Sequence, residues 1–144
     1  CPDETRSVAE QVNRLGRMDA VIHNAGIYTE RGWNLDTAYS DSKLHVTALA
    51  LAFAVARCWP EVLSHAVDPG WVQARMGGRF APDTLSLGHV TQVWLAVSDD
   101  PAVRVSGGYW YHGRLERPAA MTRDPAFRSR LVAKLAMLSG VPLR

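Results

Sequence analysis

The stretch DTAYSDSKLHVTALALAFAVARCWPEVLSHAVDPG, residues 36–70, decides the fold of this 144-residue chain. It predicts a long helix over residues 37–59, with Asp36 as its N-cap and Pro60 as its stop. A short apolar strand over residues 62–67 follows and ends in a Pro-Gly turn. A helix that leads directly into a short buried strand is typical of α/β architecture.

The flanking sequence continues this alternation of helices and strands. Further helices are expected at residues 3–15, 84–97 and 125–138, and further strands at residues 18–23 and 108–112. The helix at 3–15 is amphipathic, with Val8, Val12 and Leu15 on its apolar face. Because no repeat or low-complexity linker interrupts the pattern, we expect residues 1–144 to form one α/β domain with a mostly parallel sheet.

The composition excludes several classes of protein. A net charge of +2, with both signs scattered, gives no footprint for nucleic acid. The longest apolar segment, residues 46–56, is far shorter than the ~18 residues of a membrane helix. Cys1 and Cys58 form no disulfide or metal pattern, so no metal is expected and a reducing cytoplasm is the expected compartment. The chain opens at Cys1 without Met, and we expect it to be part of a longer protein.

The first chemical signal is Tyr39-Ser40-Asp41-Ser42-Lys43. On a helix, Tyr39 and Lys43 share one face, so the phenol and the ammonium point into the same space. A cation near a phenol favours the phenolate and lowers its pKa, as a tyrosine general acid/base requires. The alternative is a solvated first turn of a helix with no catalytic role.

Two turns follow predicted strands and supply the context for this pair. The first is Asn24-Ala25-Gly26, and the second is Pro69-Gly70 with Trp71 and Val72 after it. Small residues let a ligand or a backbone approach closely. The carboxyl edge of an open α/β sheet is also where ligands bind. Each turn taken alone is more often a plain connection without a ligand.

These three motifs, in this order, resemble the short-chain dehydrogenase/reductase family over nearly the whole chain. The resemblance implies an incomplete Rossmann-like, doubly wound parallel sheet. It also implies hydride transfer between a nicotinamide cofactor, NAD or NADP, and a small carbonyl or alcohol substrate. Tyr39 would exchange a proton with the substrate oxygen, and Lys43 would hold the nicotinamide ribose. The residues implied to line the dinucleotide are Asn24, Ala25, Gly26, Pro69, Gly70, Trp71 and Val72. Substrate identity and the choice between NAD and NADP stay open.

The chain also departs from the family pattern. The first strand and its glycine-rich pyrophosphate turn are absent from this sequence. Only 12 residues separate Gly26 from Tyr39, where relatives place roughly 60 that include the catalytic serine. Position 74 is Ala74 instead of the threonine common in relatives, and His23 replaces an asparagine. We therefore do not expect the chain alone to be active.

These losses leave the strand at residues 18–23 without neighbours, and unpaired buried backbone groups cost about 1–3 kcal/mol each. Three explanations stay open: residues are missing from the sequence near Glu30-Arg31, the gene product is truncated, or the remaining strands have re-paired into a smaller sheet. Two functions stay open: an oxidoreductase of this family, or a non-catalytic remnant that acts as a binding or structural module.

The helix after Tyr39 also suggests self-association. Its segment 46–56 is apolar all round, so one face can pack on the sheet while the other needs a different cover. Small residues at Ala48, Ala50, Ala52 and Ala54 would let two copies of the helix approach closely. We expect a homo-oligomer formed through this helix.

Overall fold

The computed structural model describes residues 2–24, 35–55, 59–75 and 77–142. The joint at Glu30-Arg31, with Ala25 and Gly26, lies outside these residues, as does the side chain of Asp36. The elements in chain order are α1 (Pro2–Arg14), α2 (Leu35–Phe53), β1 (Ala66–Asp68), the 3-10 helix η1 (Leu85–Leu87), α3 (Val90–Val97), β2 (Tyr109–Tyr111), β3 (Arg114–Glu116), α4 (Ala120–Arg123) and α5 (Pro125–Ser139).

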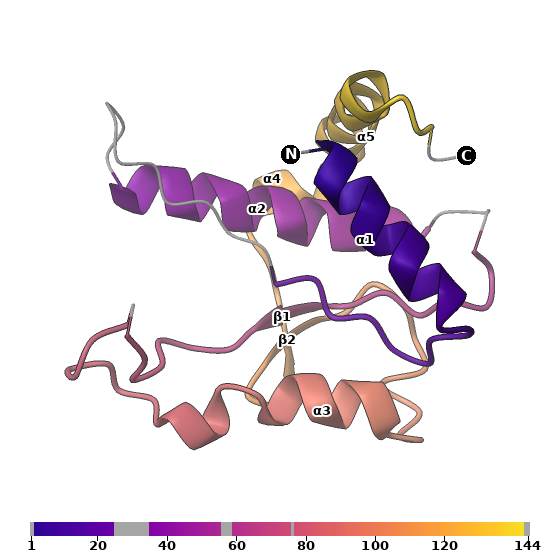
Figure 1. The fold of residues 1–144 in the computed structure, drawn as a ribbon. Helices are drawn as coiled ribbons and strands as arrows, with labels where there is room; N and C mark the ends of the chain where they lie inside the picture. Colours follow the sequence, from indigo (N-terminus) through magenta and orange to yellow (C-terminus); the bar gives the residue numbers. More distant parts are fainter. Residues whose placement is uncertain (1, 25–34, 56–58, 76, 143–144) are drawn as a thin grey trace.

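The sheet is small and mixed. Strands β1 and β2 are parallel neighbours, with Val67 opposite Trp110, and β3 pairs antiparallel with β2. Helices α2, α4 and α5 lie on one side of the sheet and α3 lies on the other (Figure 1). A partly parallel sheet between helical layers confirms the expected α/β class with an incomplete Rossmann-like fold.

The prediction of a strand at residues 18–23 is wrong. Residues 20–24 have no regular structure, and Val21 and Ile22 are 65% and 63% exposed. A strand needs a neighbour to pair its N–H and C=O groups, and β1, β2 and β3 pair only with one another among the described residues. The apolar run therefore stays unpaired on the surface.

Helix α1 forms where the sequence predicts it, but it buries no face. Val8 and Val12 are 59% and 36% exposed, and Leu15 just beyond the helix is 78% exposed. The apolar periodicity thus predicted the helix correctly and its packing incorrectly.

Helix α2 is shorter than expected at its C-terminal end. It ends at Phe53 instead of Trp59, where the bond from the Val55 N–H to the Ala52 carbonyl tightens the last turn. Its two flanks are covered by β1 on one side and by α4 and α5 on the other. This arrangement confirms that an all-round apolar helix is covered on both sides.

The expected helix at 84–97 is divided, and the expected strand at 62–67 is shortened. Gly88 separates η1 from α3, and its N–H bonds back to the Leu85 carbonyl three residues earlier. Before β1, Ser64 uses its N–H on the Ser106 hydroxyl and its own hydroxyl on the Ala50 carbonyl, so the ladder starts only at Ala66.

The C-terminal elements agree best with the sequence. Strand β2 and helix α5 form within one or two residues of their predicted bounds, whereas β3 and α4 were not predicted. The Asp124 side chain caps α5 by accepting from the Ala126 N–H, and Gly140 ends it with φ 71°. Cap residues and apolar periodicity together explain this agreement.

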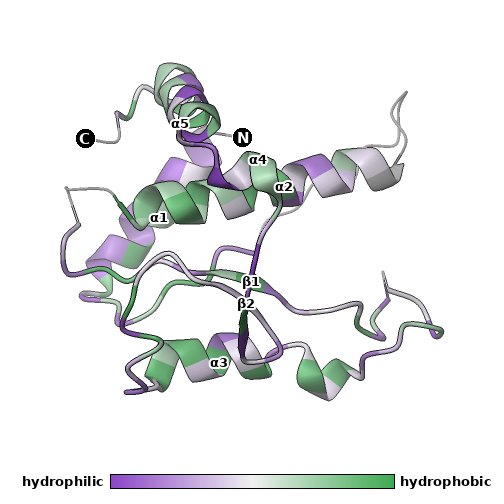
Figure 2. Cartoon of the chain, turned by 180° about the vertical axis from the view of Figure 1, so that it is seen from behind, coloured by the Kyte–Doolittle hydropathy of each residue, from purple (hydrophilic) through white to green (hydrophobic). Residues whose placement is uncertain are grey.

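The core is small and consists mainly of alanines. The buried apolar residues are Ala38, Ala48, Leu51, Ala52, Ala66, Ala81, Val103 and Trp110. The chain exposes 11004 Å², where a monomer of 15.9 kDa is expected to expose about 7,400 Å². Helix α3 is largely hydrophobic (Figure 2), yet its Val90, Val93 and Val97 are 51%, 50% and 76% exposed. Much apolar surface of the described residues is therefore open to solvent.

A half-buried histidine, His65, directly precedes β1 and bonds to two other parts of the chain. His65 Nδ1 accepts from Trp110 Nε1 at 3.2 Å, and its Nε2 lies 2.9 Å from the Val103 carbonyl oxygen. Because a carbonyl only accepts, Nε2 carries the proton and the ring is neutral. Burial lowers the pKa of His65, while the bond to Val103 opposes this shift. His65 thus has a structural role.

Candidate active site

Tyr39 and Lys43 lie one turn apart near the start of α2, and the structure brings their side chains together. Lys43 Nζ is 5.6 Å from the centroid of the Tyr39 ring, and both side chains are half-buried. The Ser42 hydroxyl donates to the Tyr39 carbonyl at 2.7 Å. The first turns of α2 therefore place the Tyr39 phenol and the Lys43 ammonium side by side on one face of the helix.

The segment that ends at Asn24 reaches this pair from a distant part of the chain. Lys43 Nζ donates to the Asn24 carbonyl oxygen at 3.5 Å, across 19 positions of sequence. Asn24 is the first residue of the Asn-Ala-Gly motif, whose Ala25 and Gly26 lie outside the described residues. Lys43 thus lies beside the Tyr39 ring and bonds to Asn24, the first residue of the Asn-Ala-Gly motif.

The Pro69-Gly70 turn follows the carboxyl end of β1 and requires glycine. Gly70 has φ 83°, and its N–H bonds to Asp68 Oδ1 at 2.9 Å. A Cβ at this position would lie 2.3 Å from Asp83 Oδ2. The close approach at Gly70 is therefore made by another part of this chain, the carboxylate of Asp83.

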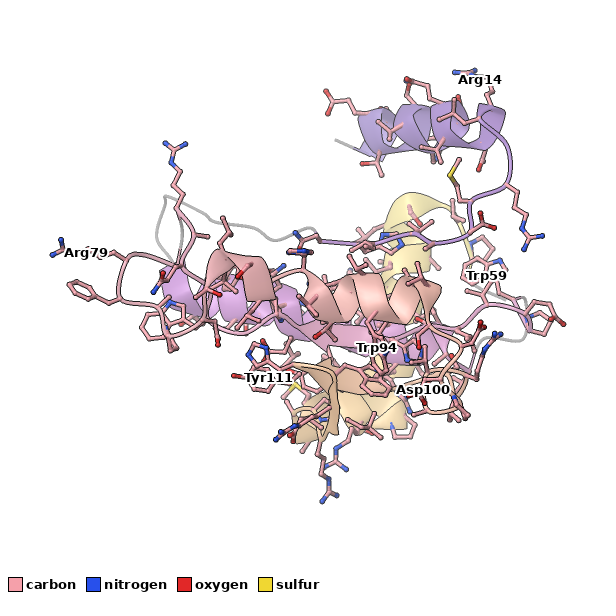
Figure 3. All side chains as sticks on the ribbon, turned by 90° about the horizontal axis from the view of Figure 1, so that it is seen from below. Arg14, Trp59, Arg79, Trp94, Asp100 and Tyr111 are labelled. Carbon is pink, nitrogen blue, oxygen red and sulfur yellow. The ribbon has the colours of Figure 1, made fainter. Side chains whose placement is uncertain are left out.

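Trp71 and Val72 begin a loop that closes on itself. The Asp83 N–H bonds to the Trp71 carbonyl, and the Gln73 N–H bonds to the Asp83 carbonyl. The Trp71 side chain is 61% exposed, and its Nε1 donates to the Gly77 carbonyl. Arg79 projects outward near the tip of this loop (Figure 3). The loop lies at the same end of the molecule as the start of α2 (Figure 1).

Three polar residues near this turn were missed at the level of sequence. Tyr109 of β2 donates its hydroxyl to Asp68 Oδ2 at 3.1 Å. Burial and the Asp68 carboxylate raise the pKa of Tyr109 to about 12. Asp83 Oδ1 lies 3.2 Å from His112 Nε2, with both side chains largely buried. In the sequence, Asp83 is marked only by the preceding Pro82, and Tyr109 and His112 only by their place in the aromatic segment 108–112.

The described residues hold no cluster of three or more His, Cys, Asp or Glu side chains that would bind a metal ion. Among them, no helix combines the length and the apolar character that crossing a membrane demands.

Comparisons with known proteins identify several relatives. The protein named short-chain dehydrogenase chry4 from Gibberella zeae is 26% identical over 201 positions, covering 97% of this chain and 76% of that protein. Carbonyl reductase (NADPH) 1 from Sus scrofa is 34% identical, covering 58% of this chain and 30% of that protein. The protein named short-chain dehydrogenase chyC from Penicillium rubens is 27% identical, covering 67% of this chain and 59% of that protein. No family model matches the chain, and no solved structure matches it.

The alignment with the Gibberella zeae protein also measures what is absent. It is 201 positions long, whereas this chain has 144 residues, so at least 57 positions of that protein face no residue here. The chain spans only about a third of the length of the pig reductase.

Proposed function

Because the chain is homologous to short-chain dehydrogenases and carbonyl reductases and fits a part of that family, we propose that it carries the proton-transfer half of a nicotinamide-dependent oxidoreductase site. Tyr39 is the general acid, and Lys43 positions it. The observation that carries this proposal is the place of Lys43 Nζ, 5.6 Å from the Tyr39 ring centroid and 3.5 Å from the Asn24 carbonyl.

The proposed chemistry is reduction of a small carbonyl compound or oxidation of the corresponding alcohol. A nicotinamide cofactor, when bound, supplies or accepts the hydride at the carbonyl carbon. In the reducing direction Tyr39 gives its hydroxyl proton to the carbonyl oxygen, which becomes the alcohol oxygen. The positive charge of Lys43 stabilises the phenolate left behind. The cofactor is NAD or NADP, and the name of the pig relative favours NADP.

The described residues fit one end of such a cofactor better than the other. The half-buried ammonium of Lys43 is a hydrogen-bond donor suited to ribose hydroxyls. No glycine-rich turn before a helix occurs in this sequence to seat the pyrophosphate. The space beside the Gly70 Cα is occupied by the side chains of Asp83 and His112. We therefore propose that this chain binds the nicotinamide ribose and the substrate oxygen. Pro69, Gly70, Trp71 and Val72 would line the nicotinamide end of the cofactor.

A second candidate function is a non-catalytic binding or structural module. The exposed area of 11004 Å² and the bare apolar side chains of Val8, Val21 and Ile22 favour it. Surfaces of this kind are typical of proteins that associate. We propose self-association on this ground. Of the small residues of α2 expected to face a second copy, Ala48 and Ala52 are 0% and 9% exposed within one chain, whereas Ala50 and Ala54 are only half-buried.

The substitution Tyr39→Phe tests the proposed reaction. In the active protein that contains this chain, NADPH-dependent reduction of an aldehyde should fall by roughly 10²–10⁴-fold with cofactor binding unchanged. Tyr111→Phe is the matched control, since Tyr111 is 37% exposed and lies on β2, away from α2. More than about a tenth of the rate left in Tyr39→Phe would place the acid elsewhere.

A further inference from the structure

A hollow lies on the side of the sheet opposite to Tyr39 and Lys43. It has a volume of about 300 Å³ and is formed by η1, α3 and the turn between β2 and β3. We call it the α3 pocket, and its lining residues are Leu87, Val90, Thr91, Trp94, His112 and Gly113. Its volume is at the lower end of the range of small-molecule sites.

The wall of the α3 pocket is largely apolar and is held in place. Trp94 of α3 packs edge-on against the buried Trp110 of β2 with 5.2 Å between ring centroids. The Thr91 hydroxyl accepts from the Gly113 N–H at 3.1 Å and is buried. This hydroxyl is therefore already engaged with the protein, which leaves the His112 ring as the polar side chain offered to a ligand.

His112 is held in this position at a conformational cost. It has φ 46°, a left-handed conformation that costs a non-glycine residue about 1–2 kcal/mol. Its ring packs on Tyr111 with 4.1 Å between centroids, and its Nε2 lies 3.2 Å from Asp83 Oδ1. The carboxylate only accepts, so it favours the proton on Nε2. No bond from a described residue to Nδ1 is found, so Nδ1 is available to a ligand.

We propose that the α3 pocket binds a small alcohol or phenol. The apolar body of the molecule lies against Leu87, Val90 and Trp94, and its hydroxyl bonds to Nδ1 of His112. A hydroxyl group suits this nitrogen in either protonation state, because it donates to a neutral ring and accepts from a protonated one. This inference rests on contacts of the α3 pocket alone and does not need the proposed hydride transfer.

The test is fluorine NMR of the 144-residue chain with 4-fluorophenol, in the absence of any nicotinamide. 4-Fluorotoluene has nearly the same shape but no hydroxyl. We expect 4-fluorophenol to bind roughly threefold to tenfold more tightly, as one hydrogen bond allows. His112→Gly should abolish this preference, since glycine adopts the backbone conformation freely while the ring is lost. Equal binding of the two probes would overturn the role of His112.

Two valines of α3 provide a matched pair for the location. Val90 lines the pocket and Val93 does not, yet their exposures are 51% and 50%. Val90→Trp should fill the pocket and lower the affinity for 4-fluorophenol by at least tenfold, whereas Val93→Trp should leave it unchanged. Leu87→Trp is a second filling variant if Val90→Trp does not fold. Equal loss in both valine variants, or none in either filling variant, would refute the site.

Discussion

Residues 2–24 and residues 59–142 have similar apolar patterning but very different surroundings. In the first region every described side chain from Asp3 to Asn24 is exposed, including Val21 and Ile22. In the second region, Trp110 and Val103 are 3% and 2% exposed around a paired sheet. The difference shows that apolar periodicity specifies an element only when the chain also supplies what the element packs against.

The largest expected effect comes from a charge on the helix that packs on the second region. Ala52→Glu puts a carboxylate at a 9% exposed position of α2, which contacts β1, α4 and α5. Burial of an unpaired charge should destabilise the fold by ~3–5 kcal/mol. Urea unfolding monitored by circular dichroism measures this loss. Ala133→Glu, at an exposed position of α5, is the matched control and should change stability by less than about 0.5 kcal/mol.

A smaller effect is expected at the Pro-Gly turn. Gly70→Ala places a Cβ 2.3 Å from Asp83 Oδ2 at a residue with φ 83°, and should destabilise by about 2–3 kcal/mol. Gly78→Ala is the control, because Gly78 has φ 76° with no atom within 4 Å of its Cβ. It should lose only the backbone contribution, about 1 kcal/mol. Equal losses at the two glycines would show that Asp83 does not pack on the turn.

The smallest effect is expected in the unpacked region. Ile22→Ser changes a side chain that is 63% exposed, so its unfolding free energy should stay within about 0.5 kcal/mol of the original. Val103→Ala, at a position 2% exposed, should destabilise by roughly 2 kcal/mol. A loss from Ile22→Ser as large as that from Val103→Ala would mean that residues 18–24 pack in solution, against the chain itself or a second copy.

The sequence predicted the parts of the structure that depend on local signals. Helix α5 has an Asp124 cap and a Gly140 stop, and the Tyr39/Lys43 spacing follows from helix geometry. It did not predict contacts that depend on tertiary packing. The Asp83–His112 pair joins residues 29 positions apart, and neither belongs to a motif. The strand at 18–23 failed for a related reason, because its apolar run has the length of a strand but no strand among the described residues pairs with it.

The central claim is that this chain holds the proton-transfer residues of a nicotinamide site without the segment that binds the pyrophosphate. Calorimetric titration of the 144-residue chain with NADPH tests it most directly, since a Rossmann-type site takes much of its cofactor affinity from backbone donors at a helix N-terminus. We predict no binding heat at cofactor concentrations up to about 1 mM, the weak limit of ordinary binding sites. A dissociation constant in the micromolar range would contradict this account.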